Sequence, residues 1–254
     1  MVNYHDPSVI LADLRALTRF LHVGDGVYIW DCFSTLWFEW SFVKGEQPYR
    51  WSIWVYASTR LATLLNVLTN LIGFNVRKSI NCQLWLYSEF ITAYTAFALG
   101  SLLMLLRIVA IWSTNKWVLG ASIGTWLTNL AFLIRSVVIT SAHWDHTLGM
   151  CVLDESQRSR DNTTATFCAE AFLLLVMLAG LMRQRDHYLG RLLFNQGLIW
   201  LIAATIAEVP PFVLLFLNLN GPWNLMFQTS SLLIMTMCVT RMYRGLSASR
   251  DHQQ

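Results

Sequence analysis

The sequence predicts an all-α integral membrane protein that folds as a bundle of seven transmembrane helices. Of its 254 residues, 55% are hydrophobic and only 13% are charged, whereas a soluble domain of this size needs more charge on its surface. The apolar residues also fall in long blocks, and a block of about 20 such residues crosses a hydrocarbon core of about 30 Å. The sequence shows no linker and no internal repeat, so residues 1–254 are predicted to form one domain.

Seven apolar blocks define the predicted spans. The first, residues 19–43, is the weakest because two glycines and two aspartates interrupt it. The others cover residues 51–74, 84–112, 117–142, 163–182, 189–217 and 222–243. The polar tail, residues 244–254, is predicted to be disordered. The first twenty residues hold four charges and no continuous apolar core, so no cleaved signal peptide is expected and the first span is predicted to direct insertion.

The distribution of basic residues predicts the orientation of the bundle. Seven spans place the two termini on opposite sides of the membrane. The N-terminal side collects Arg15, Arg19, Arg77, Lys78, Arg158 and Arg160, and the C-terminal side collects Lys44, Arg50, Lys116, Arg183, Arg185, Arg191, Arg241, Arg244 and Arg250. Since cytoplasmic loops carry the excess of Lys and Arg, we expect the C-terminus in the cytoplasm and the N-terminus outside.

The longest predicted loop, residues 143–162, carries a glycosylation signal. Asn162-Thr163-Thr164 is the only N-x-[ST] sequence in the chain, and such a signal is used only on the lumenal side of a membrane. Its position therefore agrees with a loop outside the cell, and Asn162 is a candidate glycosylation site. The short distance from Asn162 to the fifth span works against its modification.

Two cysteines are expected outside the hydrocarbon region. Cys82 stands at the outer start of the third span and Cys151 in the long loop, so both face an oxidising compartment in the predicted orientation. We expect a Cys82–Cys151 disulfide that ties the loop over the helix bundle and the mouth of a cavity reaching toward Glu208. The alternative is two unpaired cysteines. The remaining three cysteines lie within spans, where they are expected as small buried residues.

Several short motifs resemble a family of multi-pass membrane proteins from basidiomycete fungi. The pattern Asp-x-x-x-Thr-Leu-x-x-Glu is complete from Asp31 to Glu39, and it is followed by Arg60-Leu61, by residues 106–110 (LRIVA) and by residues 240–243 (TRMY). The N-terminal portion of that family is catalogued as a domain of unknown function. Trp37 and Phe38 depart from it, since the family often has polar residues there. The resemblance covers nearly the whole chain and implies seven helices in a eukaryotic membrane, but no activity.

Charged side chains inside the predicted spans identify candidate functional residues. A charge near the bilayer centre costs about 2.5–3.5 kcal/mol, and those near span ends, namely Glu39, Glu89, Arg107 and Glu170, are expected to reach the interface. Asp31 and Arg60 lie deeper, about 18 and 14 Å from the inner boundary at 1.5 Å per residue. Because the first two spans are antiparallel neighbours, we expect Asp31 to face Arg60, with Glu39 as a second partner. Such a pair fixes helix register or, alternatively, belongs to a ligand or proton path.

The sixth predicted span holds a further candidate beside two prolines. Glu208 precedes Val209-Pro210-Pro211, and prolines inside a helix remove backbone donors and kink it. An acid at such a break is a candidate to line a cavity, although a kink that serves packing alone is the more common case. Arg107, at the inner end of the third span, occupies a position analogous to a basic residue in seven-helix receptors. This is an analogy of topology alone.

The sequence narrows the function without identifying it. No G-x-S-x-G, P-loop, HExxH or CxxC motif is present, and the His143–Asp145–His146 group lacks an evident third strong ligand for a metal. No cofactor is predicted, and the absence of a basic cluster with exposed aromatic residues argues against nucleic acid. The expected partners are the lipid bilayer, in the plasma membrane or an endomembrane, and a small apolar ligand. Three classes stay open: a receptor-like or sensory protein, an enzyme acting on a lipid or terpenoid in fungal secondary metabolism, and a transporter or accessory protein.

Overall fold

The computed structural model describes residues 7–45, 51–75, 81–145, 150–153, 157–183, 188–217 and 221–251. Within these ranges the chain forms seven long helices and one short hairpin. The helices are α1 (Pro7–Val43), α2 (Trp51–Asn75), α3 (Cys82–Ile111), α4 (Lys116–Ile139), α5 (Gln157–Arg183), α6 (Tyr188–Leu217) and α7 (Gly221–Asp251), and the strands are β1 (Ala142–Asp145) and β2 (Met150–Leu153). The predicted all-α class with seven helices is thus observed, with the hairpin as an addition.

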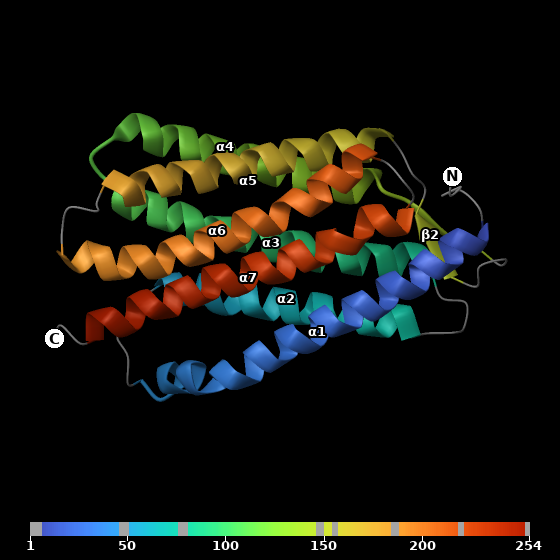
Figure 1. Ribbon diagram of the computed structural model, residues 1–254, viewed down its shortest axis with the longest axis horizontal. Coiled ribbons are helices and arrows are strands. Elements are labelled where there is room, and N and C mark those ends of the chain that lie inside the picture. Colours follow the sequence, from blue (N-terminus) through green and yellow to red (C-terminus); the bar gives the residue numbers. More distant parts are fainter. Residues whose placement is uncertain are drawn as a thin grey trace.

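The seven helices run roughly along one long axis of the molecule (Figure 1). The hairpin lies at the end of the bundle where α3, α5 and α7 begin, and we call this the hairpin end. The opposite end, where α7 finishes, is called the C-terminal end. Helices α2 and α3, and likewise α6 and α7, form the most extensive contacts, whereas α1 packs more against α7 than against α2.

The main hydrophobic core lies between α3, α5, α6 and α7. It is built from buried leucines, methionines and other apolar side chains: Leu103, Met104, Ile108, Leu173, Leu174, Met177, Ala204, Met235, Cys238, Val239 and Met242. A smaller cluster of Tyr28, Val67 and Leu233 joins α1, α2 and α7. Helix α7 contributes to both clusters and therefore packs against helices on both sides of the bundle.

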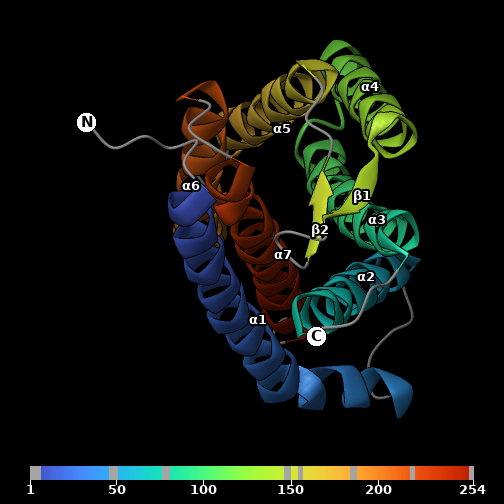
Figure 2. The same cartoon turned by 90° about the vertical axis from the view of Figure 1, so that its right-hand side faces the viewer.

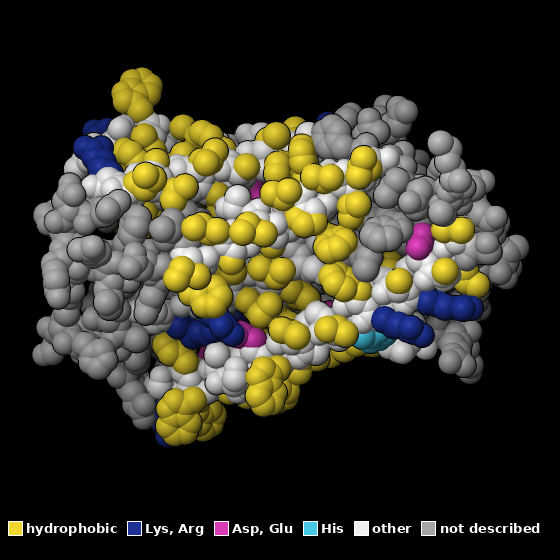
Figure 3. All heavy atoms as spheres, in the orientation of Figure 1, with side chains coloured by type: hydrophobic (Ala, Val, Ile, Leu, Met, Phe, Trp, Pro, Cys, Tyr) yellow, Lys and Arg dark blue, Asp and Glu magenta, His cyan; other side chains and the backbone are white. Residues whose placement is uncertain are grey.

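The outer surface of the bundle is largely apolar. Hydrophobic side chains spread over the face shown in Figure 3, and exposed examples include Trp30, Leu65, Leu127 and Ile206. Within the described residues, α3, α4 and the segment Thr164–Arg183 are each long and apolar enough to cross a membrane. In α2 and α7, polar residues such as Thr63 and Thr236 face the interior and lower the mean hydropathy of the helix.

Three features of the elements differ from the sequence-based expectation. Helix α1 begins at Pro7, twelve residues before the predicted first span. Helix α7 continues to Asp251, so the tail expected to be disordered is helical up to that residue; nothing in its Gly-Leu-Ser-Ala-Ser-Arg sequence stops a helix that is already formed. Asn162 lies within α5 rather than in a loop, and its side chain lies outside the described part of the structure.

The hairpin is anchored to the first turn of α3 by two contacts. β1 and β2 pair antiparallel, with Trp144 opposite Cys151. Cys151 forms a disulfide with Cys82, with Cα atoms 5.5 Å apart, which confirms the expected bridge. The Gln83 side chain bonds both to the Thr140 carbonyl (3.3 Å) and to the Ala142 amide (3.0 Å). Figure 2 shows the hairpin lying across this end of the bundle between α3 and α7.

Candidate functional site

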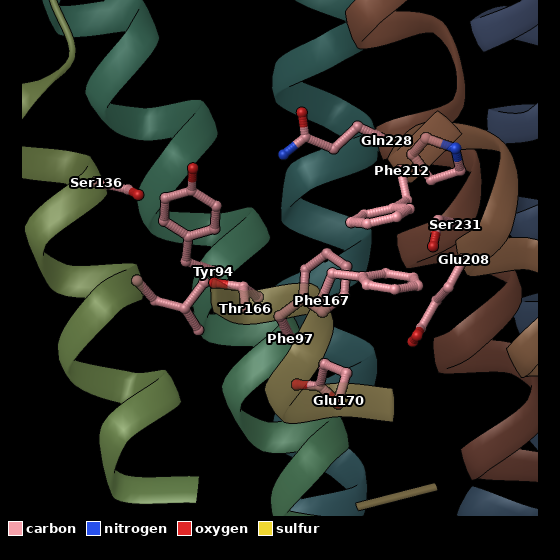
Figure 4. A pocket seen from close by; sticks show the side chains of 12 residues that line it. Tyr94, Phe97, Ser136, Thr166, Phe167, Glu170, Glu208, Phe212, Gln228 and Ser231 are labelled. Carbon is pink, nitrogen blue, oxygen red and sulfur yellow. The ribbon is translucent and has the colours of Figure 1, made fainter. Parts of the chain in front are cut away.

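A cavity with polar and aromatic walls lies among five helices of the bundle. Its volume is about 70 Å³, which is room for roughly five to seven waters at about 10–15 Å³ each. Its lining comes from α3 to α7: Tyr94, Phe97, Leu133, Ser136, Thr166, Phe167, Glu170, Glu208, Pro211, Phe212, Gln228 and Ser231. The close-up in Figure 4 shows side chains from these helices converging on one space.

Glu170 enters the cavity from α5 and is almost fully buried, with 1% of its surface exposed. The Asn129 amide of α4 donates to its Oε1 at 2.7 Å. The Ser101 hydroxyl lies next to the same carboxylate but donates to the Phe97 carbonyl (2.7 Å). Among the described residues, Glu170 Oε2 therefore has no hydrogen-bond partner, and a buried acceptor of this kind is costly unless something binds it.

Glu208 enters the same cavity from α6, where 6% of its surface is exposed. It lies within electrostatic range of Glu170, and its Oε1 has no partner among the described residues. The two following prolines lie inside the continuous helix α6 and cannot donate to the carbonyls of Ile206 and Ala207. The helix thus presents a carboxylate beside backbone carbonyls that lack their usual helical partner.

The other walls of the cavity are aromatic and weakly polar. The rings of Phe167 on α5 and Phe212 on α6 stack with centroids 4.1 Å apart. Tyr94 and Phe97 of α3 supply two more rings on the facing wall. A pocket of this kind, apolar with a few convergent polar groups, is the usual form of a small-molecule site.

A separate group of charged residues lies near the C-terminal end, and it corrects the predicted Asp31–Arg60 pair. Asp31 bonds to Arg241 of α7 (2.7 Å) and lies 3.9 Å from Arg244, while Arg60 pairs with Glu39 at 2.5 Å. The expected second partner was therefore correct and the first was wrong. The reason is that α1 packs mainly against α7, which turns Asp31 away from α2.

Tyr56 joins the two ion pairs into one network. Its hydroxyl accepts from Arg60 Nη1 (2.9 Å) and from Arg244 Nη1 (3.4 Å), and its ring stacks on Tyr243. Figure 3 shows Lys or Arg atoms beside Asp or Glu atoms between α1 and α7 toward this end. Since these charges are paired with one another, we interpret the group as a structural network that fixes α1, α2 and α7 relative to each other.

A third group of polar side chains, after the cavity and the charged network, lies between α1, α2 and α3. Glu89 accepts from Asn66 Nδ2 (2.6 Å) and from the Thr69 hydroxyl (2.7 Å). The Asp25 side chain is buried, with 1% of the residue exposed, and its Oδ1 is unpartnered among the described residues. Glu89 was expected to extend to the interface, and the structure instead bonds it to α2.

The candidate residues named from the sequence thus separate into different places. Asp31, Glu39 and Arg60 belong to the charged network, whereas Glu208 lines the cavity. Arg107 lies four residues before the end of α3, where its Nη2 is buried and has no hydrogen-bond partner among the described residues.

Sequence reasoning missed Glu170 and Asn129 as site residues. Glu170 was expected to reach the interface, but it lies fourteen positions into α5 and points into the bundle. A signal was present in both cases, because each is a lone strongly polar residue within an otherwise apolar stretch of its helix. Which of several such residues meet one another depends on helix packing, which the sequence pattern does not contain.

Comparison with models of known protein families gives no match for this chain, and a search of curated proteins likewise gives none.

Proposed function

We propose that this chain is a seven-span membrane protein that binds a small ligand in the cavity and acts as a receptor-like or sensory protein. The observation that carries the proposal is the cavity itself. Five helices converge on it, four of its twelve lining side chains are aromatic, and two buried carboxylates, Glu170 and Glu208, keep free acceptor atoms there. In this proposal, we place the N-terminus and the hairpin end outside the cell and the C-terminus in the cytoplasm.

Exposed tryptophans support a membrane position for α1, α2 and α4. Trp37, Trp54 and Trp117 expose 78%, 60% and 90% of their surface, and each lies near a helix terminus at the C-terminal end. Tryptophan concentrates at membrane interfaces because its ring is apolar and its N–H is polar. These residues therefore agree with an aromatic belt at the cytoplasmic interface, while three helices are apolar enough on their own to span.

The arrangement of the cavity favours sensing over a purely structural role. The hairpin, tied by its disulfide, lies at the end that we place outside the cell. Helix α6 passes the cavity at Glu208 and Pro211, and α7 passes it at Ser231 before continuing to Asp251. A ligand that changes the packing of these two helices would shift an equilibrium between two arrangements of the bundle by its differential affinity for them.

A membrane-embedded enzyme is the second candidate, and the same two carboxylates favour it. Paired acids with unpartnered oxygens can serve as a general acid and a general base, so a lipid or terpenoid substrate in fungal secondary metabolism remains the alternative. A transporter or accessory protein is the third class. The resemblance to a basidiomycete family supports a eukaryotic plasma membrane or endomembrane, and Asn162 is the proposed glycosylation site.

Deletion of the gene and comparison of two readouts tests the proposal. A receptor predicts a lost response to external compounds with an unchanged metabolite profile. The enzyme predicts the reverse. The deletion strain should be complemented with wild type, with Glu208→Gln, and with Glu89→Gln as a control, because Glu89 is a carboxylate on α3 that does not line the cavity. If Glu208→Gln restores the response as fully as the other two, the cavity is not the site.

A further inference from the structure

We propose that the cavity selects a protonated amine: a primary or secondary ammonium group on a small apolar body, held between Glu170 and Glu208. This inference rests on the proposed function, since it names the chemical class of ligand for the same site. It rests on three features of the cavity: its two acidic side chains, their unpartnered hydrogen-bond acceptors, and its aromatic walls.

The ionisable side chains that line the cavity are acidic, and the protein supplies no basic partner for them among the described lining residues. Two carboxylates line the cavity, and no Lys, Arg or His is found among the described residues that line it. The arginines of α7, Arg241 and Arg244, are engaged at the C-terminal end with Asp31 and Tyr56. Two buried carboxylates close together disfavour each other's ionised form, and a cation between them removes that cost. The same argument disfavours an anionic ligand.

The buried side-chain atoms of the site that lack partners are acceptors, which favours a ligand that donates hydrogen bonds. Glu170 Oε2 and Glu208 Oε1 lack partners among the described residues, and so does the buried Asn129 Oδ1 that adjoins Glu170. An ammonium group brings up to three N–H donors and a charge at one point. A hydroxyl brings only one donor and no charge, so it would leave at least one carboxylate without a partner. The donor count therefore favours an amine over an alcohol.

The aromatic walls complement a cation attached to an apolar group. A cation within about 6 Å of an aromatic ring centroid gains electrostatic attraction from the ring. The stacked pair Phe167 and Phe212 and the facing rings of Tyr94 and Phe97 enclose the same space as the two carboxylates. The volume of about 70 Å³ limits the ligand to a small amine.

Matched probes on purified full-length protein in nanodiscs test the proposal. Thermal stability and calorimetric affinity would be measured with butylamine and 2-phenylethylamine, with their neutral counterparts 1-butanol and 2-phenylethanol, with the anion 3-phenylpropionate, and with CaCl₂. We expect at least one amine to stabilise the protein and to bind about tenfold or more tightly than its alcohol. Glu170→Gln and Glu208→Gln should each weaken amine binding about tenfold, whereas the matched control Glu89→Gln should leave it unchanged.

Each result has a defined meaning. Equal binding of amine and alcohol, or loss of amine binding in Glu89→Gln alone, would overturn the amine assignment while the cavity remains a ligand site. Stabilisation by CaCl₂ but not by amines would overturn it in favour of a metal. If none of the probes binds and the Glu208→Gln strain still responds normally, the proposed ligand site fails as well. If the Gln variants do not fold, Glu170→Asp and Glu208→Asp, which keep the charge and shorten the reach, replace them.

Discussion

At the residue scale, the charged network at the C-terminal end shows how a bundle accommodates charge within an apolar structure. Asp31 is 4% exposed, whereas the Arg241 side chain that pairs with it is 43% exposed. Arg60 is similarly buried, and its partner Glu39 is one-third exposed. In each pair the buried member depends on a partner that reaches toward the surface, so the two halves of a pair should respond unequally to mutation.

Arg241→Leu should destabilise the protein more than Asp31→Leu. The first change leaves a buried carboxylate with only Arg244, 3.9 Å away, and should cost about 3–5 kcal/mol. The second leaves an arginine that is already half exposed and should cost less. Unfolding of both variants by denaturant in the same detergent measures the difference. An Asp31→Leu variant as unstable as Arg241→Leu, or more so, would contradict the assigned environment.

A double-mutant cycle on Glu39 and Arg60 should show coupling of about 0.5–3 kcal/mol, because the two side chains form a direct ion pair. The Asp31–Arg60 cycle is the control, and it should show a smaller coupling because Tyr56 and Arg244 stand between those side chains. Stronger coupling in the Asp31–Arg60 cycle would restore the pairing that the sequence predicted and the structure replaces.

The sequence predicted that Asp31 and Arg60 are buried, but it did not predict all of their contacts, and it missed the burial of Glu170. Depth along a helix follows from counting residues, so Asp31 and Arg60 were correctly expected to need partners. The identity of the partner depends on which helices adjoin, and α1 adjoins α7 although α2 follows it in the chain. The same gap explains why Glu208 was recognised as a candidate while Glu170, which meets it from another helix, was not.

At the element scale, two kinds of contact hold the hairpin to α3. The sequence could predict the disulfide, but it could not predict the hydrogen bonds of Gln83. The Cys82–Cys151 bridge followed from the expected compartment of two cysteines. The β-strands and the Gln83 bonds to Thr140 and Ala142 depend on the path of a connection whose apolar pattern is too short to read. For the same reason, the sequence analysis predicted Asn162 to lie in a loop, whereas it lies in α5.

Reduction of the disulfide should lower the unfolding temperature of the wild type. The bridge closes a loop with a sequence separation of 69 residues, for which the chain-entropy model gives about 4 kcal/mol. A bilayer or micelle that restrains the unfolded chain makes the effect smaller. Thermal unfolding with and without reductant measures it, and Cys82→Ser/Cys151→Ser is expected to match the reduced wild type and to ignore reductant.

The Cys168→Ser variant is the matched control, because Cys168 is an exposed free cysteine on α5; it should respond to reductant as the wild type does. Peptide mass mapping under non-reducing conditions gives the direct test. Recovery of both Cys82 and Cys151 as free thiols would contradict the Cys82–Cys151 disulfide.

At the scale of the whole molecule, the seven-span arrangement that we propose places the two termini on opposite sides of a membrane. Three helices are apolar enough to span by composition alone. The others hold polar side chains that face inward, including Asn66 and Thr240, so their mean hydropathy understates how apolar their outer faces are. Fold class was therefore predictable from overall composition, whereas the interior polar layers became visible only with the helices packed.

The most direct test of this account is the location of both termini in sealed microsomes, whose outer face is the cytoplasmic one. Different epitope tags on the N- and C-termini would be followed during protease digestion, with detergent-opened microsomes as the control for tag accessibility. Seven spans with a cytoplasmic C-terminus predict that the C-terminal tag is removed and the N-terminal tag is protected until detergent is added. Protection of the C-terminal tag, or digestion of both tags without detergent, would contradict the orientation and with it the placement of the hairpin end outside the cell.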